Sequence, residues 1–94
     1  MTKEEVSADK KRVKFEVAAD PKGQVYVAGT FNGWDPRRDQ LKSRNGGRIY
    51  SATLLLPAGA HEYRFVVNGK WQADPKNPRS KRNPFGSVNS LIEI

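Results

Sequence analysis

The clearest strand pattern in the chain is YSATLLLPAGAHEYRFVVNGKW, which covers residues 50–71. In its first half every second residue from Tyr50 to Leu56 is apolar, which is the period of a strand. Its other face also carries apolar residues, so we expect this strand to be central. The same alternation returns after a turn at residues 57–59, and Asn68-Gly69 then signals a tight hairpin. The segment therefore predicts antiparallel strands joined by short turns.

Strand patterns continue on both sides of this segment. Apolar and polar residues alternate near residues 13–17 and 25–29 before it, and near residues 88–94 after it. Asp20-Pro21-Lys22-Gly23 and Asn45-Gly46-Gly47 mark turns between these runs. No stretch repeats apolar residues at the spacing of a helix. We predict an all-β fold, an immunoglobulin-like β-sandwich of six to seven antiparallel strands.

The length of 94 residues and the hydrophobic content of 36% fit one small domain with a single core. The first residues are charged and almost free of apolar side chains, so we expect a flexible polar tail over residues 1–11 and a complete module over residues 12–94. The absence of cysteine excludes a disulfide scaffold, a thiolate metal site and a cysteine nucleophile. No apolar stretch reaches the ~18–20 residues of a membrane span, and we expect a cytoplasmic protein with no membrane partner.

Lysine and arginine outnumber the acidic residues by 17 to 10, which gives a net charge of +7. This excess makes polyanions, nucleic acids among them, candidate partners. The most basic stretch, residues 76–82, is either a phosphate-contacting surface or a solvated loop. The solvated loop is favoured, because cations are spread over most of the predicted loops and no RNA-binding strand motif is present.

The sequence holds little that could carry catalysis. His61 is the only histidine, and its neighbour Glu62 belongs to the opposite face of the same predicted strand. Asp35 and Asp39 could form the carboxylate pair of a glycosidase, although Asp35 in a Trp-Asp-Pro turn is better explained as a turn former. Neither a metal-ligand spacing nor a glycine-rich phosphate loop is present. We therefore predict a protein that is not an enzyme and has no metal or cofactor.

Two tryptophans fall outside the core alternation. Trp34 and Trp71 each follow an Asn-Gly turn, where a large apolar ring meets water unless something docks on it. Each indole either folds back to close an end of the sandwich or serves as a binding surface, and two indoles at corresponding hairpin ends favour binding. Both a sugar ring and a nucleobase can stack on tryptophan, but the nucleobase also brings phosphates that need a basic groove.

Three motifs, in order, resemble those of the glycogen-binding domains found in the β subunits of AMP-activated protein kinase and at the N-termini of isoamylase-like and branching enzymes. They are VYVAGTFNGW at residues 25–34, LPAGAHEYRFVVNGKW at 56–71, and DP at 74–75 with NPFGSVNS at 83–90. The first is similar to the family's Gly-x-Phe-Asn-x-Trp segment. The resemblance covers residues 12–94 and implies an immunoglobulin-like sandwich that binds α-1,4-linked glucan without cleaving it.

The resemblance also implies which residues contact the sugar. Trp34 and Trp71 match the family's two stacking tryptophans, which hold successive glucose units of the curved chain. Phe85 falls where the family has an apolar side chain that packs against this curve. Asn89 matches an asparagine that hydrogen-bonds glucose hydroxyls, and Ser87 matches a neighbouring hydroxyl or backbone contact.

Two residues depart from the family pattern. Arg64 occupies the position of a lysine that contacts the sugar, and its planar guanidinium offers a different donor geometry from an ammonium. Asn68 replaces the usual turn aspartate, and Asn-Gly suits a tight hairpin even better. The basic stretch 76–82 is not a feature that the family explains.

Three functions of different classes follow from these features. The first is binding of an α-glucan of the glycogen or starch type, as polysaccharide or malto-oligosaccharide. The second is a protein-interaction or regulatory domain with a weakened sugar site, whose partner is a kinase or a glucan-processing enzyme. The third is a single-stranded nucleic-acid binder that uses the same tryptophans, whose affinity should fall steeply with salt. The resemblance favours the first function and argues against nucleic acid.

Overall fold

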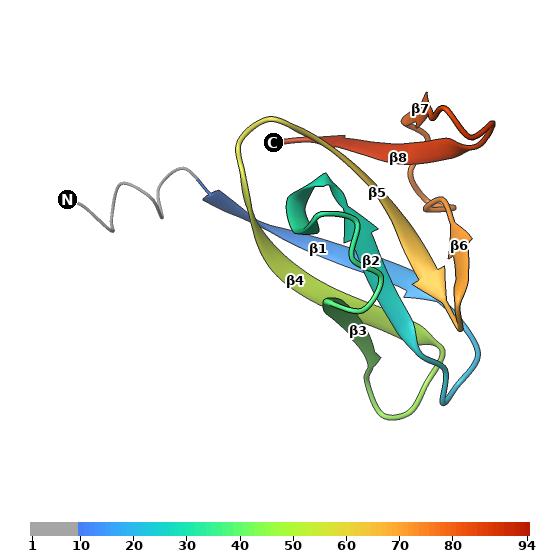
Figure 1. The fold of residues 1–94 in the computed structure, drawn as a ribbon. Helices are drawn as coiled ribbons and strands as arrows, with labels where there is room; N and C mark the ends of the chain where they lie inside the picture. The colour runs from blue at the N-terminus through green and yellow to red at the C-terminus, as the bar shows by residue number, and fades with distance from the viewer. Residues whose placement is uncertain (1–9) are drawn as a thin grey trace.

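A computed structural model describes residues 10–94 as eight β-strands and one short 3-10 helix (Figure 1). The elements in chain order are β1 (Lys10–Ala18), β2 (Val25–Gly29), η1 (Thr30–Asn32), β3 (Asp39–Ser43), β4 (Ile49–Pro57), β5 (Ala60–Val67), β6 (Lys70–Gln72), β7 (Ser80–Arg82) and β8 (Val88–Glu93). The predicted all-β class is confirmed. Within this described part of the chain, no helix is long and apolar enough to cross a membrane.

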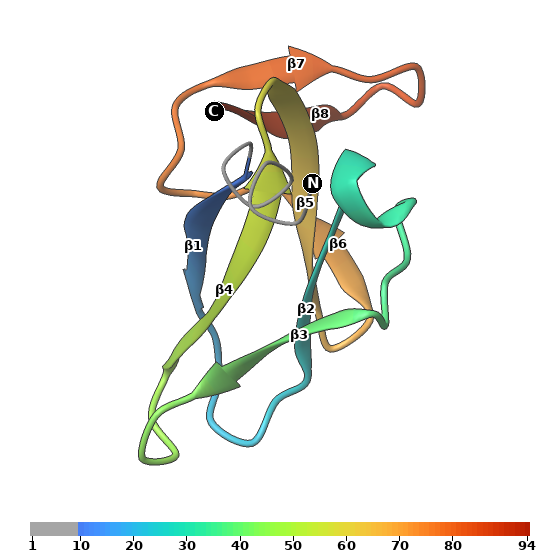
Figure 2. The same ribbon diagram turned by 90° about the vertical axis from the view of Figure 1, so that its left-hand side faces the viewer.

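The strands form one hydrogen-bonded path, β1-β4-β3-β2-β5-β8-β7, that curls into two layers (Figure 2). Every pair along it is antiparallel, and β6 joins the path by pairing with β5. The layers meet face to face, since the rings of Phe15 in β1 and Tyr63 in β5 pack edge to face with centroids 5.0 Å apart. The structure thus confirms the predicted antiparallel sandwich.

The core between the layers is built from the alternating apolar residues of the sequence pattern. In β5, for example, Tyr63 and Phe65 are buried, whereas Glu62 and Arg64 lie on the other face. The buried cluster consists of Phe15, Val17, Val25, Val27, Leu41, Tyr50, Leu56, Tyr63 and Phe65. Removal of this apolar surface from water is the main driving force for folding.

The structure has eight strands where six to seven were expected. The short strand β7 accounts for the difference, because every residue in it is exposed and no apolar alternation marks it. Strand β1 also begins earlier than expected, so that Lys10 and Lys11 of the expected tail over residues 1–11 belong to a strand. The rest of that tail lies outside the described residues.

Turns form where the sequence signals placed them. Asn68 and Gly69, between β5 and β6, both have positive φ, 51° and 84°, as a type I′ hairpin requires. The Asn68 side chain also accepts a hydrogen bond from the backbone N–H of Gln24 at 2.9 Å, which ties this hairpin to the β1–β2 loop. Asp35 Oδ1 accepts from the N–H of Arg37 at 2.9 Å, so its expected role as a turn former is confirmed.

The basic stretch 76–82 is largely paired with carboxylates. Its ion pairs are Lys76–Glu16 at 3.7 Å, Arg79–Glu93 at 3.2 Å and Lys81–Glu62 at 3.6 Å. Pairs as exposed as these contribute at most about 1 kcal/mol each. They agree with the solvated-loop interpretation, and among residues 10–94 they leave Arg82 as the cation of this stretch without an ion-pair partner.

A hydrogen-bonded group anchors the segment that follows β6. The Tyr63 hydroxyl donates to Asp74 Oδ2 at 2.7 Å and accepts from Asn77 Nδ2 at 3.1 Å.

Replacing Tyr63 by phenylalanine deprives Asp74 and Asn77 of this contact, so we expect the free energy of unfolding to fall by about 1–3 kcal/mol. Urea denaturation measures the change. The control Tyr26→Phe, which removes the hydroxyl of a half-buried tyrosine in β2, should change stability by less than about 0.5 kcal/mol.

The hydrogen-bonded group around Tyr63 also predicts that the stability of the protein depends on pH in the alkaline range. Burial, reinforced by the hydrogen bond to Asp74, raises the pKa of Tyr63 above its ordinary value of 10.0. The folded protein therefore keeps this proton at a pH where the unfolded chain has lost it, so the stabilisation is complete below about pH 10 and declines above it. Wild-type protein should lose stability faster than Tyr63→Phe between about pH 10 and pH 11. Parallel pH profiles of the two proteins would contradict this.

Candidate functional site

The outer face of β5 is the centre of the candidate site. One edge of β5 pairs with β2. The other edge is shared, because the first half of β5 pairs with β8 and its last residues pair with β6. Arg64 falls between these two pairings. Opposite residues in antiparallel strands share a face. The register pairs Ala28–Arg64 and Val66–Trp71 therefore place Arg64 and Trp71 on one face, away from the buried Phe65.

Trp34 lies in a tight turn beyond the end of β2. Its backbone N–H donates to the carbonyl of Gly29 at 2.9 Å, and the backbone N–H of Asp35 donates to the carbonyl of Asn32 at 3.4 Å. Gly33 and Trp34 both have positive φ, 68° and 61°. Glycine adopts this conformation freely, but for a bulky residue it costs about 1–2 kcal/mol. Strained backbone of this kind is concentrated at functional sites, which makes Trp34 a candidate for one.

The buried side chain of Asn32 holds this turn in place. Its Oδ1 accepts from the N–H of Gly29 at 3.0 Å, while its Nδ2 donates to the carbonyl of Val27 at 3.0 Å and to Asp39 Oδ2 at 2.7 Å. Gly29 has no room for a side chain, because a Cβ there would lie 2.5 Å from the carbonyl oxygen of Glu62. The glycine and the asparagine of the motif thus fix the backbone from which the indole projects.

Phe85 stands in the loop between β7 and β8 and is 91% exposed. Asn83 closes this loop, since its Oδ1 accepts from the N–H of Phe85 at 3.0 Å and from the N–H of Ser87 at 3.2 Å. The backbone N–H of Asn83 donates in turn to the carbonyl of Ser87 at 2.9 Å. Gly86, with φ 82°, allows the chain to reverse. The loop is therefore closed by hydrogen bonds while it presents a phenyl ring to solvent.

Asn89 is buried, and its amide is engaged with protein groups. Its Nδ2 donates to Glu62 Oε1 at 3.0 Å, and its Oδ1 accepts from Asn83 Nδ2 at 3.1 Å. The other carboxylate oxygen of Glu62 lies 3.6 Å from Lys81 Nζ. The four side chains form a row along the β8 side of the face, in which the partly exposed Glu62 acts only as an acceptor.

Arg64 is half-buried in the middle of this face. Its Nε is buried and has no hydrogen-bond partner among residues 10–94. A buried donor without an acceptor costs about 1–3 kcal/mol. The side chain as a whole keeps some exposed surface, so the rest of the guanidinium is available to a ligand on the face.

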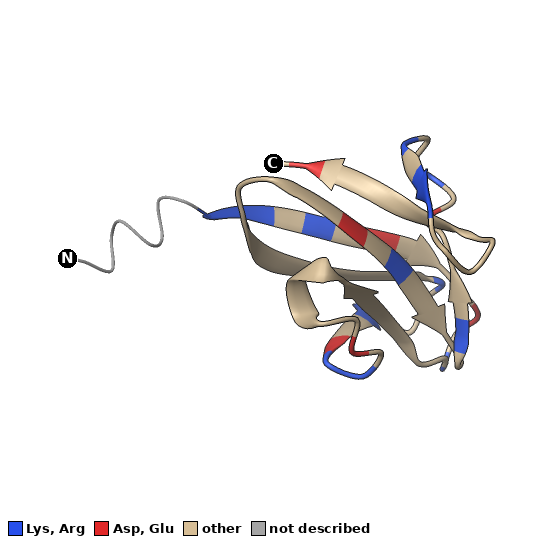
Figure 3. Ribbon diagram, turned by 45° about the horizontal axis from the view of Figure 1, so that its top comes forward, with Lys and Arg blue, Asp and Glu red and all other residues tan. Residues whose placement is uncertain are grey.

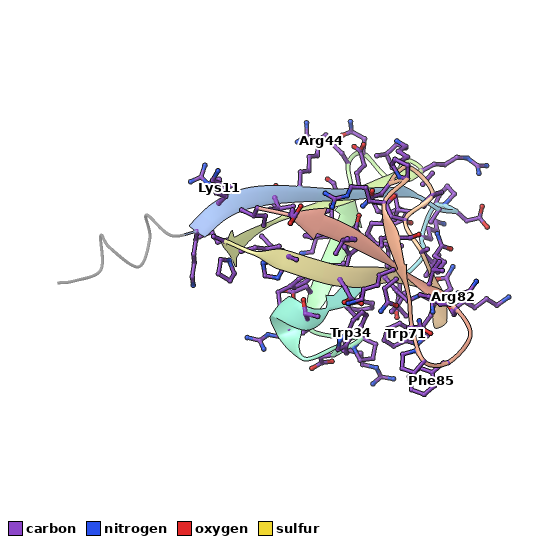
Figure 4. All side chains as sticks on the ribbon, turned by 90° about the horizontal axis from the view of Figure 1, so that it is seen from above. Lys11, Trp34, Arg44, Trp71, Arg82 and Phe85 are labelled. Atoms are coloured by element: carbon purple, nitrogen blue, oxygen red, sulfur yellow. The ribbon has the colours of Figure 1, made fainter. Side chains whose placement is uncertain are left out.

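Figure 4 shows Trp34, Trp71 and Phe85 gathered on one side of the molecule, although they come from three separate segments. We call these three side chains the aromatic platform. Trp71 is 42% exposed and Trp34 is half-buried. Of the other residues predicted from the sequence, Arg64 shares the sheet face of Trp71, half-buried Ser87 lies in the Phe85 loop, and Asn89 is buried in β8.

Other candidate features lie away from the platform. His61 is buried with its Nε2 2.8 Å from the carbonyl oxygen of Pro57, so it has a structural role at the β4–β5 turn. Two shallow surface hollows are lined mainly by residues of β1, β3 and β4 and by the neighbouring turns. Within residues 10–94, no group of three or more His, Asp or Glu residues is placed to hold a metal ion.

Sequence reasoning missed the residues that support the platform. Asn32 and Asn83 each precede a turn, and an asparagine side chain that bonds nearby backbone N–H groups is a common device at such positions. Glu62 lies two residues before Arg64 in β5 and therefore on the same face, a signal that the alternation already contained.

The fold and the platform define a small β-sandwich binding module. A family model described as the glycogen recognition site of AMP-activated protein kinase matches residues 12–94. The chain belongs to this family.

Curated relatives are subunits of that kinase. The chain is 37% identical over 71 residues to the 5'-AMP-activated protein kinase subunit beta-2 of Homo sapiens, and equally so to subunit beta-1 of Sus scrofa. Both alignments cover 76% of this chain, but 25% of the human sequence and 54% of the pig sequence. The chain thus spans about a quarter to a half of the length of these relatives.

A solved structure with a similar fold is the enterobactin esterase FES from Shigella flexneri. The TM-score is 0.69 at 22% sequence identity, and the match covers 88% of this chain and 29% of the esterase chain. At this level of identity the likeness shows the fold alone.

Proposed function

We propose that this chain binds α-1,4-linked glucan, as glycogen, starch or malto-oligosaccharide, without cleaving it. The observation that carries the proposal is the aromatic platform, together with membership of a glycogen-recognition family. The C–H face of a pyranose ring packs on an aromatic ring, so Trp34 and Trp71 take up glucose units and Phe85 packs against the curve of the chain. The specificity for a bent α-linked chain comes from rings held on three separate segments, the turn after η1, strand β6 and the β7–β8 loop.

Polar groups on the same face complete the proposed site. Arg64 supplies N–H donors, and Glu62 supplies a carboxylate acceptor for glucose hydroxyls. Ser87 and Asn89 contact the sugar at the Phe85 end, Asn89 through the second N–H of its amide. Hydroxyl hydration must be displaced for every contact made, so affinity per site is modest and several sites act together on a branched polymer.

The open face has the shape of a binding surface, unlike the deep pocket of a typical enzyme. We therefore assign the chain a non-catalytic role. The cytoplasmic location expected from the sequence is kept as part of the proposal.

Indole fluorescence during titration with maltoheptaose or β-cyclodextrin tests the proposal. A saturable change is expected, because stacking of a sugar ring alters the surroundings of Trp34 and Trp71. Cellohexaose, whose β-linkages make a straight chain, should give no such change, and salt should have little influence because the ligand is neutral. Absence of a response at millimolar maltoheptaose, or an equal response to cellohexaose, would reject the proposal.

A protein partner is a second proposal, favoured by the relatives, which are kinase subunits. The outer face of β4 belongs to the other layer and exposes Ile49 (47%) and Leu55 (60%), which offer a surface for a kinase or a glucan-processing enzyme. Co-purification of such an enzyme that is lost in Leu55→Glu would support this role. If the chain also failed to bind maltoheptaose, this second function would replace the first.

A further inference from the structure

Cations lie in segments that neighbour those of the aromatic platform, although a neutral glucan offers no charge for them to bind. Figure 3 shows basic segments in the turn after η1, in the middle of β5 and in β7. The residues are Arg37, Arg38, Arg64, Lys81 and Arg82. In Figure 4, Arg82 is on the same side of the molecule as Trp71 and Phe85. Among the ion pairs of residues 10–94, Lys81 is the one of these five cations that has a carboxylate partner.

The carboxylates in the same region are already engaged. Asp35 accepts from the backbone of Arg37, Asp39 accepts from Asn32, and Glu62 is shared by Asn89 and Lys81. Their charges offset part of the local excess, but the chain as a whole still carries +7. The guanidinium groups near the platform therefore retain N–H donors for a ligand.

Arg64 is the cation best placed to meet that ligand. It shares a sheet face with Trp71, and its buried Nε has no partner among the described residues. A guanidinium presents a planar fork that can hold a phosphate through two parallel N–H···O bonds, whereas the ammonium of a lysine is a point charge. Two hydroxyls of one glucose do not offer this paired anionic acceptor, so the fork suits a phosphate better than a neutral sugar.

From these observations we infer that the platform prefers α-glucan chains that carry phosphate monoesters over neutral chains, and that Arg64 contacts the phosphate. Arg82 adds a second positive charge at the Phe85 end. The inference rests on the proposed glucan-binding function and adds a ligand class to it.

Isothermal titration with a matched pair of ligands tests the inference. One ligand is a maltodextrin fraction that carries phosphate monoesters, and the other is the same fraction after enzymatic removal of the phosphate. At low ionic strength the phosphorylated fraction should bind about fivefold more tightly, the change expected of one partly exposed charge-assisted contact. At about 0.5 M salt the two affinities should converge, because exposed charges are then screened over a few ångströms.

The ratio of the two affinities is the readout for variants. Arg64→Gln should bring this ratio close to one. Arg82→Gln should lower it in part because the Arg64 contact remains, and Arg64→Lys should lower it in part because the charge remains while the fork is lost. Lys70→Gln is the matched control. Lys70 is an exposed cation beside Trp71, but its register partner Val67 places it on the other face of the sheet. Its loss removes the same charge and should leave the ratio unchanged.

Four results would overturn the assignment, and each is distinguishable. Equal affinities for the two fractions at low salt would reject the phosphate preference and leave the proposed function intact. If Lys70→Gln lowered the ratio of the two affinities as much as Arg64→Gln, the preference would come from the net charge of the protein and not from a contact of Arg64. Single-stranded oligothymidylate that binds more tightly than the phosphorylated fraction, through Trp71, would make nucleic acid the ligand. Failure of both fractions to bind would reject the glucan-binding function itself.

Discussion

Replacing Trp71 by alanine is expected to weaken maltoheptaose binding by about 30- to 150-fold and to abolish retention on glycogen. An indole that stacks on a sugar ring and excludes water from it resembles an interface hot spot, whose truncation costs about 2–3 kcal/mol. Trp71 is 42% exposed, so its removal should affect the sugar site far more than the core. Isothermal titration gives the affinity, and affinity electrophoresis in glycogen gives the retention.

A loss of similar size is expected for Trp34→Ala, because this indole forms the other side of the platform. The matched control is Leu55→Ala, which truncates a 60% exposed apolar side chain on the other layer and should leave the affinity unchanged. Wild-type affinity in both tryptophan variants would show that the platform is not the sugar site.

The largest loss of stability is expected from Asn32→Ala. The substitution leaves the N–H of Gly29, the carbonyl of Val27 and the carboxylate of Asp39 without the contacts that the amide supplies. Unsatisfied buried groups of this kind cost about 1–3 kcal/mol each, so we expect the free energy of unfolding to fall by about 2–4 kcal/mol. In a domain of this size such a change lowers the midpoint of thermal unfolding by roughly 10–25 °C, which circular dichroism measures.

The control for this experiment is Gln40→Ala, which removes an exposed amide from β3 and should change stability by less than about 0.5 kcal/mol. Below its unfolding temperature, Asn32→Ala should also bind maltoheptaose more weakly, because the turn that carries Trp34 is no longer fixed. Unchanged affinity in the folded variant would mean that other contacts suffice to hold the indole.

Most of the fold can be predicted from the sequence, because a strand with one buried face shows it in the spacing of its residues. Phe15 and Val17, chosen by this criterion, lie in the core. Strand β7 could not be found in this way, since its residues are all exposed and its place is set by backbone pairing with β8. The short β3 is nearly as difficult, because Leu41 is its single buried residue.

The site is predicted less completely than the fold. The motifs single out Trp34 and Trp71 as rings outside the core, but they do not show that the amide of Asn89 is engaged with Glu62, a residue 27 positions away in sequence. That contact exists because β8 pairs with the first half of β5. The unpartnered Nε of Arg64 likewise depends on neighbours brought together by the fold, which no local pattern contains.

The division of one edge of β5 between β8 and β6 has a consequence for evolution and for engineering. Trp71 sits on one branch of this forked edge, and Phe85 sits on the loop that enters the other. Insertions or deletions between the branches can change the distance between the rings of Trp71 and Phe85, while the buried strand β5 beneath them is left intact. A library that varies the lengths of the two connections could therefore yield variants that bind glucan helices of different pitch on one unaltered scaffold.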